Sequence, residues 1–173
     1  MGGIMKAQVI YYSRYGSTRE IAQSLGNKLG TDNICEVRDL KKITGDLAII
    51  GAPIYVEVPH EEIMRLLFDE EGRLKDKPVA LFVVCLRKNL VKVGDKEGGG
   101  PLYLRRMEEA LGKLPVASKI FGGRMIASEL GEEDRKRTEM FSKKVGMPFK
   151  DVDIMSEKEV DEFVQDIKTK MMV

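Results

Sequence analysis

Hydrophobic residues gather in four short runs along the chain, and the segments between these runs are mostly polar. The runs are AQVIYY near residue 9, DLAIIGA near residue 49, VALFVVCL near residue 83 and KIFGGRMIA near residue 123. Runs rich in Val, Ile and Phe that lack strict alternation are typical of strands covered on both faces. A weaker run, NICEVRDL, lies between the first two and is a candidate for a fifth strand.

Three segments between these runs have the hydrophobic period of a helix, at residues 18–29, 60–68 and 102–111. A regular alternation of strands and helices predicts a parallel sheet whose strands are joined by crossover helices. The predicted fold class is therefore α/β.

The last part of the chain predicts two more helices, in EEDRKRTEMFSKKVG and SEKEVDEFVQDIKTKM. Ser156 and Glu159 have the spacing of a capping box at the start of the final helix. That helix is expected to cover the far side of the sheet with an apolar stripe formed by Val160, Phe163, Val164, Ile167 and Met171. Residues 87–101 lack periodicity and contain three successive glycines, so we predict a long loop there.

Length and composition describe an ordinary globular chain. Its 173 residues are expected to form one domain, residues 1–173, and no apolar run approaches the roughly 18 residues that a membrane span needs. Lys and Arg number 29 against 28 for Asp and Glu, so no overall field would concentrate nucleic acid. The start, MGGIMKAQVIYY, lacks the features of a signal peptide, and we expect a cytoplasmic protein.

The sequence offers few side chains that could bind a metal or act in catalysis. Cys35 and Cys85 lie far apart in apolar runs and are expected to be buried free thiols. Because His60 is the single histidine and there is no close cysteine pair, we expect no metal site. His60 fits the start of a helix better than a role in acid–base chemistry, and no catalytic residue is assigned.

The segment YYSRYGSTREIA, residues 11–22, joins the first predicted strand to the first helix. If Tyr12 ends the strand and Thr18 begins the helix, the connecting loop lies at the carboxyl edge of a parallel sheet, where ligands bind. Gly16 lets backbone approach a ligand, and the N-terminus of a helix favours an anion such as phosphate. An ordinary turn in which Ser17 or Thr18 caps the helix is the alternative.

Other phosphate or phosphoryl sites of α/β proteins require residues that this loop lacks. A dinucleotide-binding loop needs GxGxxG and a P-loop needs GxxxxGK[ST]. A receiver domain needs carboxylates at strand ends that here read YYSRYG and GAPIYV, and a cysteine phosphatase needs a thiolate in this loop. A monophosphate bound without a metal remains as the expected ligand.

The loop resembles the flavodoxin phosphate loop, [ST]xTGxT, which wraps the phosphate of FMN in that family. Tyr15 stands where flavodoxins have Thr. The string SRYGSTREIA is still more similar to the flavodoxin-like menaquinone-dependent protoporphyrinogen oxidases, and the likeness continues in GAPI, FGGRM and EVDEFVQDI. The resemblance implies a three-layer flavodoxin-like sandwich with strand order 2-1-3-4-5 and FMN as cofactor. The phosphate-binding residues that it implies are Ser13, Arg14, Tyr15, Gly16, Ser17 and Thr18.

In flavodoxins the loops after the third and fourth strands hold the flavin ring, and here they would be residues 52–59 and 86–100. Tyr55 could stack against the isoalloxazine, since the flat apolar ring makes such contact favourable; a partly buried packing role is the alternative. The candidate ring-binding residues are Ala52, Pro53, Ile54, Tyr55, Leu86, Arg87 and Lys88.

The fourth-strand loop is basic where flavodoxins are generally acidic, because it carries Arg87, Lys88 and Lys92. Cations near the ring would stabilise the negative charge of reduced flavin and raise its reduction potential. Charges that simply face solvent are the alternative reading.

These patterns predict an FMN-binding redox protein, either an electron carrier or a small flavin-dependent oxidoreductase. Its partner would be a redox protein or a small-molecule electron donor or acceptor. A quinone-dependent protoporphyrinogen oxidase is one alternative, but residues 130–149 carry many charges and few large apolar side chains, so we expect a helix that covers the core there. A flavin-free binding module is the other alternative, which Tyr15 keeps open.

Overall fold

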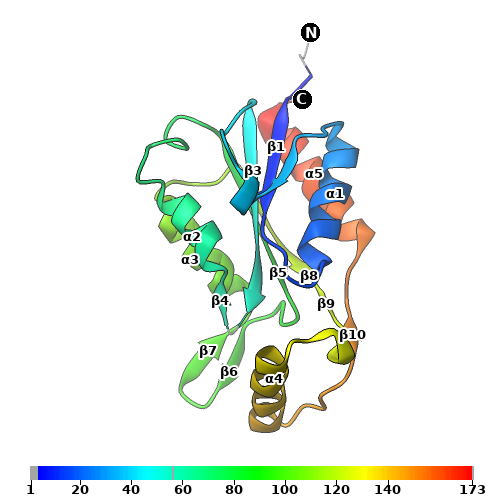
Figure 1. The fold of residues 1–173 in the computed structure, drawn as a ribbon. Helices are drawn as coiled ribbons and strands as arrows, with labels where there is room; N and C mark the ends of the chain where they lie inside the picture. Colours follow the sequence, from blue (N-terminus) through cyan, green and yellow to red (C-terminus); the bar gives the residue numbers. More distant parts are fainter. Residues whose placement is uncertain (1–3, 56, 173) are drawn as a thin grey trace.

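The computed structural model describes residues 4–55 and 57–172 and is built around a parallel sheet (Figure 1). The sheet order is β2-β1-β3-β5-β8, which is the predicted order 2-1-3-4-5 when the five main strands are counted along the chain. The predicted flavodoxin-like α/β fold is therefore confirmed. The strands are β1 (Ala7–Tyr11), β2 (Ile34–Glu36), β3 (Leu47–Tyr55), β5 (Val79–Cys85) and β8 (Ala117–Gly122).

Helices cover both faces of the sheet, as the apolar strands require (Figure 1). On one face lie α1 (Ser17–Leu29) and α5 (Glu157–Met171), which enclose one buried cluster together with alternate strand residues. The other face is covered by α2 (Glu61–Phe68) and α3 (Gly100–Leu111), which enclose the second cluster. The alternation of strand side chains between the two clusters follows from the two-residue period of a strand.

The predicted stripe of α5 is confirmed, because Val160, Phe163, Val164 and Ile167 are buried and Met171 packs against the same cluster. The ring of Phe163 meets Phe82 and Phe121 edge to face, with centroids 6.3 and 5.7 Å away. Such edge-to-face pairs add to the stabilisation that burial alone provides.

The predicted capping box is wrong. Ser156 occupies the N-cap of α5 but makes no side-chain hydrogen bond there. The carboxylate of Glu159 does not reach back to the start of the helix. It pairs with Lys88 and accepts a hydrogen bond from the backbone N–H of Gly122 at 3.4 Å. The acidic side chain therefore connects α5 to the carboxyl edge of the sheet.

The segment predicted as a long loop contains a hairpin instead. Strands β6 (Val91–Val93) and β7 (Lys96–Gly98) pair antiparallel and leave Gly94 and Asp95 as the turn. Gly94 has φ +63°, a conformation that glycine adopts at no steric cost. Strands of three residues are too short to give a clear pattern in the sequence.

The predicted loop after the third strand is also mostly strand. β3 continues through Tyr55, and β4 (Val58–Pro59) turns back to pair with it, so that Ile54 opposes Pro59. Val56 lies outside the described residues. The extension carries β3 past Gly51, the last of its residues that pairs with β1, while Pro53 still pairs with Val84 of β5.

The segment between β8 and α5 carries α4 (Glu132–Val145). It leaves through β9 (Arg124–Met125) and η2 (Ala127–Glu129) and returns through β10 (Val152–Asp153), which pairs with β9. The expectation that this helix covers the core is wrong, because α4 has no buried residue. Figure 1 shows α4 beyond the carboxyl ends of the strands, on the side away from both termini.

Both cysteines are free, but Cys35 is half-buried, and only Cys85 fits the expectation of a buried thiol. The short helix η1 (Val37–Asp39) follows β2. Within residues 4–55 and 57–172, no helix combines the length and apolar character needed to cross a bilayer.

Candidate functional site

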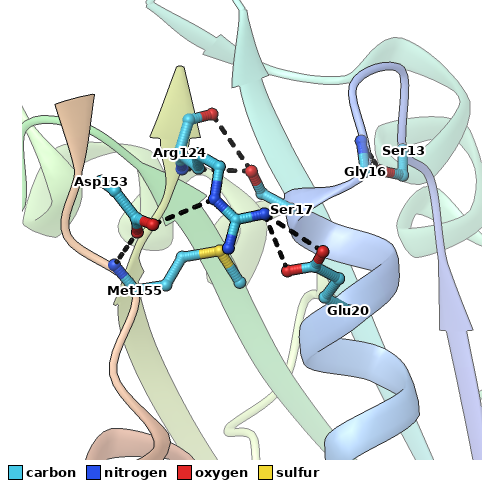
Figure 2. A network of polar contacts seen from close by, with 7 residues as sticks. All are labelled: Ser13, Gly16, Ser17, Glu20, Arg124, Asp153 and Met155. Carbon is cyan, nitrogen blue, oxygen red and sulfur yellow. Dashed lines mark hydrogen bonds and ion pairs between the residues drawn. The ribbon is translucent and has the colours of Figure 1, made fainter. Parts of the chain in front are cut away.

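The loop between β1 and α1 leaves the start of the helix open. Gly16 is the N-cap residue, with φ +102° and no side-chain cap, so the alternative in which Ser17 or Thr18 caps the helix is wrong. The hydroxyl of Ser13 accepts a hydrogen bond from the N–H of Gly16 at 3.0 Å (Figure 2). The first helical bond runs from Glu20 N to Gly16 O, and no side chain caps the N–H groups of residues 17–19.

Ser17 connects this helix start to β9 (Figure 2). Its hydroxyl donates to the carbonyl oxygen of Arg124 and accepts from the N–H of the same residue, both at 3.1 Å. The guanidinium of Arg124 pairs with Glu20 at 3.1 Å and with Asp153 at 3.0 Å. Both hydrogen-bonding functions of the Ser17 hydroxyl are thus used within the protein, and β9 is held against α1.

Tyr15 connects the same loop to α4. Its hydroxyl donates to the carboxylate of Asp134 and accepts from the N–H of Gly131 at 3.2 Å. Arg14 also reaches Asp134, with 2.7 Å between the guanidinium nitrogen and the carboxylate oxygen. Burial raises the pKa of Asp134, but the hydrogen bonds from Tyr15 and Arg14 outweigh burial and leave this pKa below its usual value.

Tyr55 lies at the end of β3, next to the first loop. Its hydroxyl accepts a hydrogen bond from the backbone N–H of Arg14 at 3.0 Å, and the guanidinium of Arg14 lies 4.8 Å from its ring centroid. The ring of Tyr15 meets it edge to face at 6.0 Å. Burial raises the pKa of Tyr55 to about 12, so its hydroxyl stays protonated near neutral pH.

His60 has the structural role that was predicted for it. It is the N-cap residue of α2, where its Nδ1 accepts from the N–H of Glu62 at 3.4 Å. Its ring stacks on Tyr12 with centroids 3.6 Å apart, and burial lowers its pKa. The histidine begins a helix and does not line the cavity at the carboxyl edge of the sheet.

A cavity of about 570 Å³ opens at the carboxyl edge of the sheet, a volume typical of small-molecule sites. Eight of the predicted site residues line it: Tyr15, Ser17, Thr18, Pro53, Ile54, Tyr55, Leu86 and Arg87. Five others do not: Ser13, Arg14, Gly16, Ala52 and Lys88. The structure therefore brings residues from all three predicted loops to one cavity.

The three basic residues of the fourth-strand loop point to different places. Arg87 lines the cavity, pairs with Glu57 at 2.8 Å and stacks over Phe141 at 4.1 Å. Lys88 forms an ion pair with Glu159 of α5, and Lys92 is exposed on β6. Arg87 is therefore the one of the three at the cavity.

The outer wall of the cavity is formed by the segment between β8 and α5, and this wall was not predicted from the sequence. Among its residues are Met125, Ile126, Leu130, Thr138, Met140 and Phe141. Residues 132–145 contain few apolar side chains, so the sequence carried no clear stripe that would have marked an inward face. The spacing of Asp134, Thr138 and Phe141, which is one helical face, was the available signal.

Two solved flavodoxins share the fold. The flavodoxin of Streptococcus pneumoniae TIGR4 is 16% identical with a TM-score of 0.52, and the match covers 95% of this chain and 98% of that one. The Fusobacterium nucleatum flavodoxin bound to flavin mononucleotide is 14% identical with a TM-score of 0.53, with 96% and 98% covered.

A larger protein matches more weakly. The rubredoxin oxygen:oxidoreductase of Desulfovibrio gigas is 13% identical with a TM-score of 0.49; the match covers 97% of this chain, which spans 37% of that protein's length. A search of curated proteins found no match. A family model described as "Flavodoxin domain" matches residues 8–150. On this match, the chain belongs to the flavodoxin family.

Proposed function

We propose that this chain is an FMN-binding redox protein. The observation that carries the proposal is the open start of α1 beside a cavity at the carboxyl edge of a flavodoxin-type sheet. A helix N-terminus supplies backbone N–H donors and a partial positive charge, both of which favour a phosphate. A Cβ placed on Gly16 would meet no atom within 4 Å, so there is room beside the loop for a ligand.

The residues present fit the cofactor. The backbone of the first turn and the hydroxyl of Thr18 would bind the phosphate, whereas the Ser17 hydroxyl is already bonded to Arg124. Tyr55 and the adjoining residues of β3 would contact the flat, largely apolar isoalloxazine, as would Leu86 and Arg87. FMN supplies reversible electron transfer when bound, while the protein binds and orients it and limits its contact with water.

Of the three basic residues predicted in the fourth-strand loop, Arg87 is the one that would act on the charge of the bound cofactor. A cation beside the ring favours the reduced, more negative state. Glu57 partly offsets that effect because its carboxylate lies 2.8 Å from the guanidinium. Lys88 and Lys92 contribute little in this arrangement, since neither lines the cavity.

A second candidate is a quinone-dependent protoporphyrinogen oxidase, favoured by the string SRYGSTREIA in the first loop. We place it second because α4 offers few apolar side chains to contact a porphyrin. A flavin-free binding module is the third candidate, favoured by the commitment of the Ser17 hydroxyl to Arg124.

Titration of flavin-free protein with FMN, and separately with riboflavin, tests the proposal. Each hydrogen bond to a charged group contributes about 1.5 to 3 kcal/mol, so FMN should bind at least roughly tenfold more tightly than riboflavin, which lacks the phosphate. Equal affinities would place the phosphate away from the first loop. A protein that retains neither flavin would overturn the redox function and favour the binding module.

A further inference from the structure

The position of α4 cannot come from core packing. The helix has 14 residues, and none of them is buried. An isolated helix of this length is only marginally stable in water, so a few specific contacts must hold it in place and in helical form.

The first of these contacts is made by Asp134. Its side chain is 16% exposed, whereas the neighbouring Glu133 is 77% exposed and Glu132 is 84% exposed. Asp134 is thus the acidic residue of the first turn that faces inward, where it meets the hydroxyl of Tyr15 and the guanidinium of Arg14. Charge-assisted hydrogen bonds of this kind are among the stronger polar contacts in proteins.

The second contact lies two turns further along the helix. The guanidinium of Arg87 is 4.1 Å from the ring centroid of Phe141, and Arg87 is itself held by Glu57. Asp134, Thr138 and Phe141 are four and then three residues apart, so they share one face of α4. All three line the cavity, and this face therefore forms part of its outer wall.

We propose that Asp134 is a positioning residue that holds α4 across the cavity, so that small, largely apolar organic molecules reach a cofactor bound there and protein-sized partners do not. The proposal rests on the proposed function, because it requires a redox cofactor in the cavity. The small reactant would meet Thr138, Met140 and Phe141, whose side chains provide mainly apolar contacts. Among redox proteins of this fold, the chain would therefore transfer electrons to and from small molecules.

Proteolysis of the flavin-free protein tests whether Asp134 holds the helix. The variant Asp134→Asn removes the charge, and Glu133→Gln makes the same charge change on an exposed neighbour. Trypsin would cut α4 after Arg135, Lys136 or Arg137 once the helix detaches and unfolds. Loss of one charged hydrogen bond should speed this cleavage roughly tenfold in Asp134→Asn and leave Glu133→Gln close to the parent. Equal cleavage of the two variants would overturn the proposal.

Electron transfer from the FMN-loaded, reduced protein tests the size limit. 1,4-Benzoquinone accepts two electrons and two protons, whereas cytochrome c accepts one electron, so each two-electron-reduced flavin consumes one quinone or two cytochrome c molecules. The cytochrome c rate divided by the benzoquinone rate should rise roughly tenfold in Asp134→Asn and stay unchanged in Glu133→Gln, if detachment of α4 limits access. An unchanged ratio in Asp134→Asn would overturn the proposal, even with faster proteolysis. Failure of every variant to bind FMN would instead overturn the proposed function, and the proteolysis result keeps these two failures distinct.

Discussion

The hydroxyl of Tyr15 donates a hydrogen bond to the carboxylate of Asp134, which lies 119 residues further along the chain. Tyr15 occupies the position where the flavodoxin phosphate loop has Thr. The longer side chain reaches α4, and it also accepts from the N–H of Gly131. The departure from the flavodoxin pattern is therefore matched by a tertiary contact that a threonine would be too short to make.

The Tyr15 contact predicts a measurable shift in the titration of Asp134. The pKa of Asp134 is lower in the folded protein than in the unfolded chain, so the ionised carboxylate stabilises the fold. This stabilisation is fully present above the unfolded pKa of about 3.9 and is lost as the pH falls through the folded pKa. In Tyr15→Phe, the pKa of Asp134 should rise toward its usual value, since the hydroxyl that favours the carboxylate is gone. An NMR titration of the side-chain carboxyl measures this directly. Asp153, which also has a lowered pKa but pairs with Arg124, should not shift and serves as the internal control.

Gly16 and Gly30 offer a matched pair for testing the phosphate loop. They flank the two ends of α1, have φ values of +102° and +70°, and leave open space where a Cβ would lie. Alanine at either position should cost about 1 to 2 kcal/mol of unfolding free energy, because L-residues are strained in the left-handed region. We expect Gly16→Ala, but not Gly30→Ala, to weaken FMN binding, as measured by fluorescence titration. Equal affinities in the two variants would move the phosphate away from this loop.

Thr18 tests the side-chain part of the same site. The residue is 1% exposed and lines the cavity, so Thr18→Val keeps the shape of the side chain and removes the hydroxyl. If that hydroxyl binds the phosphate, FMN affinity should fall roughly tenfold or more while riboflavin affinity changes little. A parallel loss for both flavins would assign the effect to packing.

The sheet could be predicted because strands such as VALFVVC are buried on both faces, and their composition alone marks them. The apolar stripe of α5 could also be predicted, since a core-facing helix repeats its apolar residues at helical spacing. The place of α4 could not be predicted, because polar contacts to Tyr15 and Arg14 hold it and such contacts leave no periodic pattern. Glu159 shows the same limit: its spacing from Ser156 matched a capping box, but the tertiary partner Lys88 competes for the carboxylate. For the site, residues next to strand ends were found, and the wall formed by Thr138 and Phe141 was not.

The last prediction concerns the charge beside the flavin. The sequence left open whether Arg87, Lys88 and Lys92 raise the reduction potential or simply face solvent, and of these three the structure places only Arg87 at the cavity. At an effective dielectric of about 20 to 40 and a separation of about 8 Å, one charge contributes on the order of 1 to 2 kcal/mol, which is tens of millivolts. Potentiometric titration of bound FMN should therefore show a lower potential in Arg87→Gln.

Two features of the site set the controls for that measurement. Lys92→Gln removes the same charge from the exposed hairpin and should leave the potential nearly unchanged, because solvent and salt screen it. Glu57→Gln should raise the potential, since it frees Arg87 from its 2.8 Å ion pair. The Arg87→Gln effect should shrink as salt is added. A drop in Lys92→Gln as large as that in Arg87→Gln would mean that the hairpin, and not Arg87, sets the field at the flavin.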